Sequence, residues 1–121
     1  PGGLEAAIEV WAYVQSRPER GRSLLTVGKR DISFDSGMPV PLRWFRPGGA
    51  MARPEPMPAG HTVLALYDQH CLLGSPEASP RQLGDMVAYG IGHSHPTFDK
   101  WAVLMLVDDD LRVTGAIRTF F

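Results

Sequence analysis

The sequence offers one pair of side chains whose types and spacing suit a metal ion, His93 and His95. They are one residue apart, so in an extended segment both imidazoles would point to the same side of the chain. Neutral imidazole is a common ligand of zinc and related ions. A structural zinc site needs four ligands, whereas a catalytic one can leave positions open for water or substrate. Spacing alone does not distinguish such a site from an ordinary surface His-x-His pair.

Any further ligands have to come from other parts of the chain. The candidates are Asp99, His61, His70 and Cys71, and the order of residues does not say which of them lies near the pair. Asp99 could instead orient one imidazole through a hydrogen bond. Cys71 is the only cysteine. Since no base neighbours it, we expect a small apolar core residue rather than a nucleophile.

A second stretch with chemical potential is Gly28–Gly37, which mixes cations, carboxylates and hydroxyls with turn-forming glycines. Loops of this kind often anchor anions or line a pocket, and this applies most to Lys29, Arg30 and Asp31. The alternative is a plain turn whose side chains bond the local backbone, which we favour for Asp35–Gly37. The chain has no phosphate-binding glycine loop and no Ser/His/Asp arrangement.

Composition indicates an ordinary globular chain. It has 121 residues, of which 44% are hydrophobic and 21% charged, enough for one domain spanning residues 1–121 with its own core. The net charge of −1, with scattered cations, argues against a nucleic-acid surface. No apolar run approaches the roughly 20 residues that cross a bilayer, so no membrane contact is expected. The single cysteine and the lack of a signal-peptide pattern fit a cytoplasmic protein.

The scaffold that must position these residues is predicted to be made of strands. The run Ala6–Gln15 alternates, with Val10, Ala12 and Val14 on one face. A helix is the competing interpretation, because Leu4–Ala7 has good helix propensity. Residues 17–21, which contain Pro18 and Gly21, are expected to end this element.

Over the whole chain the pattern predicts about six or seven strands and no helix. After the first, strands are expected at Ser23–Val27, His61–Tyr67, Cys71–Gly74, Met86–Ile91, Trp101–Val107 and Leu111–Phe120, and Ile32–Phe34 is a candidate for one more. Tight turns are expected at Asp68–His70 and Asp108–Asp110. Residues 46–60 are rich in Pro and Gly, so we expect a long surface loop without regular structure. This spacing is typical of a mainly all-β fold, a small antiparallel barrel or sandwich.

Several ordered motifs together resemble the C-terminal domain of the D-serine dehydratase and D-threonine aldolase family. They are Val10–Pro18, Gly28–Gly37, Gly84–Val87 and His93–Thr97. Three more resemble the branch labelled amino-acid deaminase: Thr97–Trp101, Val107–Asp110 and Gly115–Phe121. The resemblance spans nearly the whole chain.

The resemblance implies a fold-type III pyridoxal phosphate enzyme, built from an alanine-racemase-like N-terminal barrel and a C-terminal β-domain. In that family the barrel carries the Schiff-base lysine, and the β-domain contributes a metal pair of the form His-x-Cys or His-x-Asp. The first position matches His93. The second is His95, where the family usually has an anion, and a neutral imidazole would leave the metal more electrophilic. The resemblance therefore implies a divalent metal, zinc ahead of manganese, held by His93 and His95.

The implied activity is that of a lyase, a dehydratase (deaminase) or an aldolase, acting on a D-3-hydroxy amino acid. Pyridoxal phosphate would act as electron sink and the metal as Lewis acid on the β-hydroxyl. A barrel takes about 250 residues and cannot fit in this chain, and Lys29 and Lys100 do not fall in the family's cofactor-lysine motif. We therefore expect no catalytic residue here, no activity of this chain alone, and a homodimer at full length whose barrel packs on this domain.

A different interpretation treats the chain as a non-catalytic β-barrel, either a ligand-binding or a dimerisation module. The apolar C-terminus would then serve as a contact surface.

Overall fold

The fold comes from a computed structural model that describes residues 8–32, 34, 37–76, 81–90, 101, 103–108 and 111–118. Every regular element in these residues is a strand. The strands are β1 (Glu9–Glu19), β2 (Arg22–Leu25), β3 (Val40–Phe45), β4 (Glu55–Pro56), β5 (Thr62–Leu66), β6 (Cys71–Gly74), β7 (Met86–Gly90), β8 (Val103–Val107) and β9 (Val113–Arg118). Among the described residues, no helix is long and apolar enough to span a membrane.

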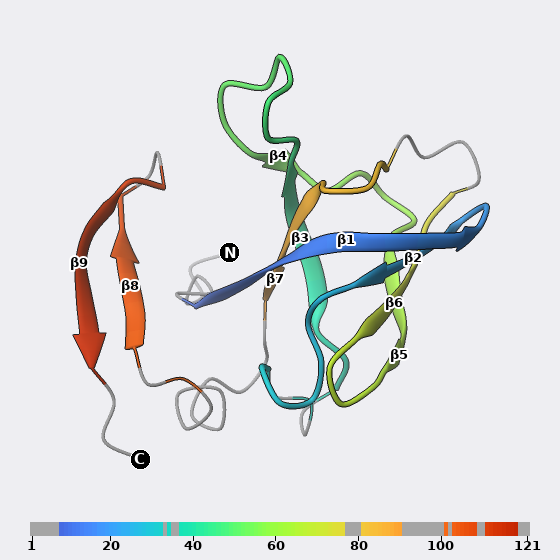
Figure 1. The fold of residues 1–121 in the computed structure, drawn as a ribbon, viewed down its shortest axis with the longest axis horizontal. Helices are drawn as coiled ribbons and strands as arrows, with labels where there is room; N and C mark the ends of the chain where they lie inside the picture. Colours follow the sequence, from blue (N-terminus) through green and yellow to red (C-terminus); the bar gives the residue numbers. More distant parts are fainter. Residues whose placement is uncertain are drawn as a thin grey trace.

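Seven strands form one antiparallel sheet in the order β4-β3-β7-β1-β2-β6-β5 (Figure 1). The sheet curls until β3 contacts β5, so that it forms a half-barrel. Strands β8 and β9 pair only with each other and make a separate two-stranded sheet. The predicted all-β antiparallel architecture is thus confirmed.

The long strand β1 settles the choice between helix and strand in favour of the strand. Val10, Ala12 and Val14 are buried, as the alternation predicts. Residues 9–13 pair with β7, and the remainder pairs with β2. The strand continues past Gln15 and ends at Glu19, within residues 17–21 where the break was predicted. Register shifts on both sides of Ser16 accommodate Pro18, which cannot donate to a regular ladder.

The core fills the inside of the curl. Its buried side chains come from strands on both sides of β1 and from the connection after β2: Val10, Ala12, Val14, Leu25, Val27, Ile32, Leu66, Cys71, Leu73, Val87 and Tyr89. Fully burying one aliphatic side chain of this kind stabilises the fold by about 1.5–3 kcal/mol.

Three local predictions are wrong. Ile32 does not begin a strand but lies buried in a bend. Strand β3 was not expected, because Pro41 interrupts its alternation; a register shift between Pro41 and Arg43 accommodates the proline. Residues 46–60 are mostly exposed, but Glu55–Pro56 forms β4 by pairing with β3. In each case a partner distant in sequence decides the local structure.

Both predicted hairpins are present. Strands β5 and β6 pair around the turn in which the Tyr67 amide donates to the His70 carbonyl, 2.7 Å. In the turn between β8 and β9, the Asp108 carboxylate accepts the Arg112 amide at 2.9 Å. Asp108 therefore acts as a turn residue.

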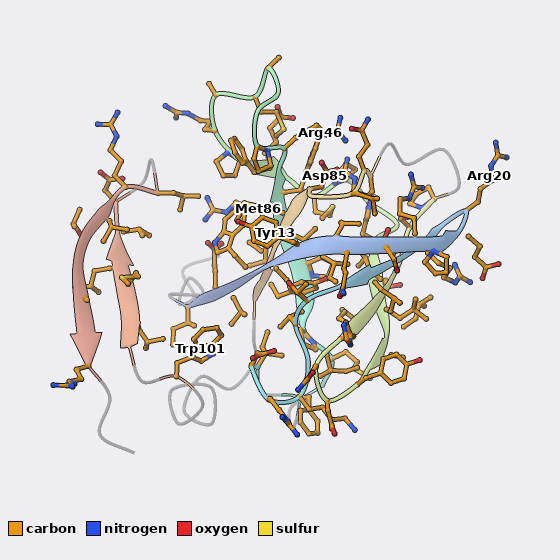
Figure 2. All side chains as sticks on the ribbon, viewed as in Figure 1. Tyr13, Arg20, Arg46, Asp85, Met86 and Trp101 are labelled. Atoms are coloured by element: carbon orange, nitrogen blue, oxygen red, sulfur yellow. The ribbon has the colours of Figure 1, made fainter. Side chains whose placement is uncertain are left out.

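An ion pair between the partly exposed Arg46 and the buried Asp85 joins the end of β3 to the start of β7. Asp85 is 1% exposed and accepts two hydrogen bonds from Arg46, Nε to Oδ1 at 2.8 Å and Nη2 to Oδ2 at 2.9 Å (Figure 2). The Gln82 amide donates to the same carboxylate, 2.9 Å. The hydrogen bond to Asp85 raises the pKa of Arg46, with burial acting in the opposite direction. The pair thus fixes how these two neighbouring strands meet.

The variant Asp85→Ala should lower the free energy of unfolding by about 2–4 kcal/mol, because it removes the buried acceptor of the Arg46 guanidinium and of the Gln82 amide. Urea denaturation followed by circular dichroism measures this. The exposed Asp68 provides a control, since Asp68→Ala should change the stability by less than about 0.5 kcal/mol. Equal midpoints for the two variants would show that the ion pair contributes nothing.

Candidate functional site

The candidate site lies at one end of the half-barrel, which is the lower end in Figure 1. In the sheet, β1 lies between β7 and β2, and β6 lies between β2 and β5. Because neighbouring strands are antiparallel, β7, β2 and β5 all run in the same direction. Their last residues, Gly90, Leu25 and Leu66, therefore point toward the same end. Three connections that the sequence singled out begin there: the stretch after β2, the turn after β5 and the segment after β7. We call this the lower end.

The connection after β2 forms a tight turn, Gly28–Asp31. The Asp31 amide donates to the Gly28 carbonyl at 2.9 Å, and the Asp31 carboxylate accepts the Gly28 amide at 3.0 Å. Lys29 and Arg30 are exposed, and the Lys29 ammonium lies 5.4 Å from the centroid of the Phe34 ring. Asp31 therefore stabilises a turn by bonding the local backbone, as the second interpretation proposed. The side chains of Lys29 and Arg30 are exposed at the surface.

This turn packs directly against the turn after β5, Tyr67–His70. The Lys29 amide donates to the Tyr67 carbonyl at 2.8 Å. Gly28 is buried, and a methyl group on it would overlap the backbone of Asp68. Only glycine permits this approach. The two turns, which we call the turn pair, thus form one block at the lower end.

Trp101 also lies at the lower end, where it contacts the turn pair. Its indole nitrogen donates to the Asp31 carbonyl at 2.7 Å, and the side chain is 38% exposed (Figure 2). His93, His95 and Asp99 lie between Gly90 and Trp101, in residues 91–100, which are outside the described residues. The residues on either side of that segment both belong to the lower end.

The other candidate ligands do not come together. His61 precedes β5 and so lies at the opposite end, where its Nδ1 is 2.9 Å from the Pro58 carbonyl and burial lowers its pKa. His70 lies at the lower end, with Nε2 2.9 Å from Gln15 Oε1, and lines a pocket of about 340 Å³. In the part of the chain that the structure describes, no three His, Cys, Asp or Glu side chains gather into a metal-binding group.

Cys71 is a core residue, as predicted. It is fully buried, and its thiol donates to the Tyr89 hydroxyl at 3.6 Å. Burial raises the pKa of Cys71 to about 11, and the hydrogen bond between Cys71 and Tyr89 only partly opposes this. A protonated, enclosed thiol of this kind does not act as a nucleophile.

The opposite end carries a cationic cluster that the sequence did not reveal, because its members come from separate segments. Arg81 is 1% exposed, and its guanidinium lies 3.5 Å from the centroid of the Trp44 ring. Arg17 donates to the Arg81 carbonyl. Burial lowers the pKa of Arg81, and Asp85 opposes this shift. The cluster lies next to the ion pair of Arg46 and Asp85, and these two residues also line a cavity of about 470 Å³.

Alkylation of Cys71 should be slow at neutral pH and should accelerate only as the pH approaches 11. A thiol with a pKa of about 11 is ionised on the order of one part in a thousand at pH 8. Because this pKa lies above the ordinary 9.0, the bound proton stabilises the native chain below pH 9, and that contribution is lost as the pH rises toward 11.

Iodoacetamide labelling followed by mass spectrometry measures the rate. The urea-unfolded chain is the control and should react at the rate of an ordinary thiol. Equal rates for the native and unfolded chains at pH 8 would contradict the buried position of Cys71.

Comparisons with known proteins point to one group. The family model described as "putative serine dehydratase domain" matches residues 7–107. The structure is similar to the crystal structure of D-threonine aldolase from Filomicrobium marinum, with a TM-score of 0.74 and 26% sequence identity. That match covers 94% of this chain and 28% of the aldolase chain, so this chain spans less than a third of that protein's length. No curated protein matches the chain.

Proposed function

Because the chain belongs to the putative serine dehydratase domain family, we propose that it is the metal-bearing domain of a pyridoxal phosphate-dependent lyase acting on D-3-hydroxy amino acids. The observation that carries this proposal is the convergence of Gly90, Trp101 and the turn pair at the lower end. The cofactor, when bound elsewhere in a longer protein, would supply an electron sink. This chain would contribute the side chains that hold a metal beside the substrate.

The proposed metal ligands are His93 and His95. Gly90 is buried in β7 between β1 and β3, where it pairs with Glu9 and Val40. His93 and His95 follow Gly90 by three and five residues in the sequence. This short separation from a residue at the lower end supports our proposal of a metal site there.

The donor chemistry fits zinc or a related ion. Two neutral imidazoles suit such a metal, and they leave coordination positions for water and a substrate hydroxyl. The exposed Lys29 and Arg30 lie on the neighbouring turn. Their positive charge would attract the carboxylate of an amino acid toward this end.

The double variant His93→Ala plus His95→Ala should weaken zinc binding by at least tenfold, since loss of even an outer partner of a metal ligand costs about 10–100-fold. Competition with a chromophoric chelator measures the affinity. His61→Ala is the matched control, because it removes an imidazole from the opposite end and should leave the affinity unchanged.

Activity provides the second arm of this test. A longer protein that contains this domain should convert D-serine, D-threonine or D-threo-3-hydroxyaspartate, and chelation should abolish the activity. Zinc binding that survives the double variant would refute the assignment of these histidines. Activity that persists under full chelation would refute the role of the metal.

A second candidate function, a docking or dimerisation module, is favoured by the β8–β9 hairpin. Paired residues lie on the same face of a sheet, and the register places Met105, Val107, Val113 and Ala116 together. All four are exposed, Met105 at 62% and Val113 at 64%. A two-stranded sheet with an exposed apolar face is marginally stable in water. This apolar hairpin face therefore suits a contact with another protein surface.

If this face pairs with a second copy, the chain should sediment as a dimer and Met105→Lys plus Val113→Lys should return it to a monomer, because two charges would be buried in the interface. Analytical ultracentrifugation measures this. Leu83→Lys is the control, since Leu83 is 66% exposed in a turn. A monomeric parent chain would exclude dimerisation through this face and leave the rest of a longer protein as its partner.

A further inference from the structure

We propose that a small monocarboxylate with an apolar body binds in the cavity next to the ion pair of Arg46 and Asp85. This cavity has a volume of about 470 Å³, within the range of small-molecule sites. The residues around it follow β3 and precede β7, so it lies at the end of the half-barrel opposite the lower end, which we call the upper end. Ligand binding in this upper cavity does not depend on the proposed metal site.

Two tight turns, residues 46–49 and 82–85, form the walls of the upper cavity. In each turn the amide of the fourth residue donates to the carbonyl of the first, at 3.3 and 3.0 Å. The third residue of each is a glycine with positive φ, 74° at Gly48 and 85° at Gly84, which is the conformation that a type II turn requires there. Both walls are therefore fixed by their local backbone structure.

Hydrogen bonds hold the two turns against each other and against β1. Arg46, at the start of the first turn, donates to the carboxylate of Asp85, at the end of the second. Val14 of β1 donates its amide to the Asp85 carbonyl at 2.8 Å and accepts the Gly84 amide at 2.9 Å. A cavity whose walls are held in this way loses little conformational freedom when a ligand binds.

The surface of the upper cavity combines a cation with apolar groups. The Arg46 side chain lines the cavity and is 28% exposed, so its guanidinium is accessible to a ligand. Tyr13, Pro47 and Leu83 also line it and are exposed, Tyr13 at 50% and Leu83 at 66%. Figure 2 shows Tyr13, Arg46 and Asp85 close together at this end. A guanidinium pairs well with a carboxylate, and the apolar groups suit the body of the ligand.

Arg81 brings a buried positive charge next to the cavity, since the following residue, Gln82, lines it. Arg81 is 1% exposed, and neither its Nε nor its Nη1 has a hydrogen-bond partner within the part of the chain that the structure describes. The Trp44 ring, 3.5 Å from the guanidinium, provides a cation–π contact. A charge in such low-dielectric surroundings is weakly screened, so its field extends into the cavity.

The charges around Arg81 leave one positive charge in excess. Burial has the largest effect on the pKa of Arg81 and lowers it; Arg46 and Arg17 lower it further, whereas Asp85 and Glu55 raise it. Among the described residues, this group comprises three guanidinium cations and two carboxylates. One anionic group on a ligand balances the excess. An ammonium group on the same ligand would be repelled, so a simple carboxylate suits the cavity better than an amino acid does.

Benzoate is the probe for the carboxylate, and benzamide is the neutral molecule of similar shape. We expect benzoate to shift the backbone amide signals of Gly48, Gly49 and Gly84 in nitrogen–proton correlation NMR spectra, with a dissociation constant on the order of 1 mM. The Gly28 amide at the lower end should not move. Benzamide and the zwitterion phenylalanine should each bind at least about threefold more weakly. The titration is made at pH 8, where His61, whose pKa is lowered by burial, is uncharged.

Arg81→Met tests the buried charge without changing a residue that lines the cavity. We expect it to weaken benzoate binding about threefold to tenfold, the effect of one nearby charge. Its melting temperature should not fall, since an apolar side chain replaces a buried charge. Arg20→Met is the matched control, because Arg20 is exposed in the turn after β1, far from Arg46 in Figure 2. It makes the same change in net charge and should bind benzoate like the parent chain.

Glu55→Gln tests the charge balance in the opposite direction. Glu55 is exposed on β4, so this variant should fold even if Arg81→Met does not. Removing a negative charge that acts on Arg81 should tighten benzoate binding about twofold. Glu19→Gln is the control, since Glu19 is an exposed carboxylate at the end of β1, and it should leave the affinity unchanged.

Three results would overturn the proposal. Benzoate that leaves the amides of Gly48, Gly49 and Gly84 unmoved would show that the cavity is not its site. Equal binding of benzoate and benzamide would show that the cavity does not recognise an anion. If the two control variants alter binding as much as the variants at and near Arg81, the attraction comes from the overall charge of the chain and not from this cluster.

Discussion

The structure depends on β1, which pairs with β7 on one side and with β2 on the other and so connects the two halves of the sheet. Residues 9–13 pair with β7 and the rest of the strand pairs with β2, so among the described strands it is β1 that hydrogen-bonds to both halves. The buried faces of Val10, Ala12 and Val14 set the register, because a slip by one residue would turn all three toward solvent. The curl of the sheet, and with it the core, follows from this shared strand.

Antiparallel pairing on both sides of β1 gives the two ends of the half-barrel different roles. The upper end carries the ion pair of Arg46 and Asp85 (Figure 2), with Arg81 stacked on Trp44 nearby. The lower end presents turns whose backbone groups are held by local hydrogen bonds. Such an end can accept an incoming chain or ligand without opening the core. This division supports a candidate site at the lower end and shows that the ion pair at the upper end joins β3 to β7.

Local sequence patterns predicted the strands whose own residues alternate between polar and apolar. They did not predict strands that form only because they pair with a segment distant in the sequence. The alternation in β1 and the turns of both hairpins were visible in the sequence. Strand β3 was not, because Pro41 breaks its pattern and only pairing with β7 makes it a strand. The same limit applies to the site. Imidazole chemistry singled out His61 and His70, but their separation to opposite ends follows from strand direction.

The sequence by itself determined the class of the fold, the buried face of β1, the hairpin turns and the resemblance that drew attention to His93 and His95. These follow from neighbouring residues, whose alternation and turn chemistry are local properties. Tertiary structure alone decided that Gly90, Trp101 and the turn pair meet at one end, and that Arg46 pairs with Asp85 at the other. The reason is that a strand's hydrogen bonds are made to other strands, so its neighbours and its direction are properties of the whole sheet.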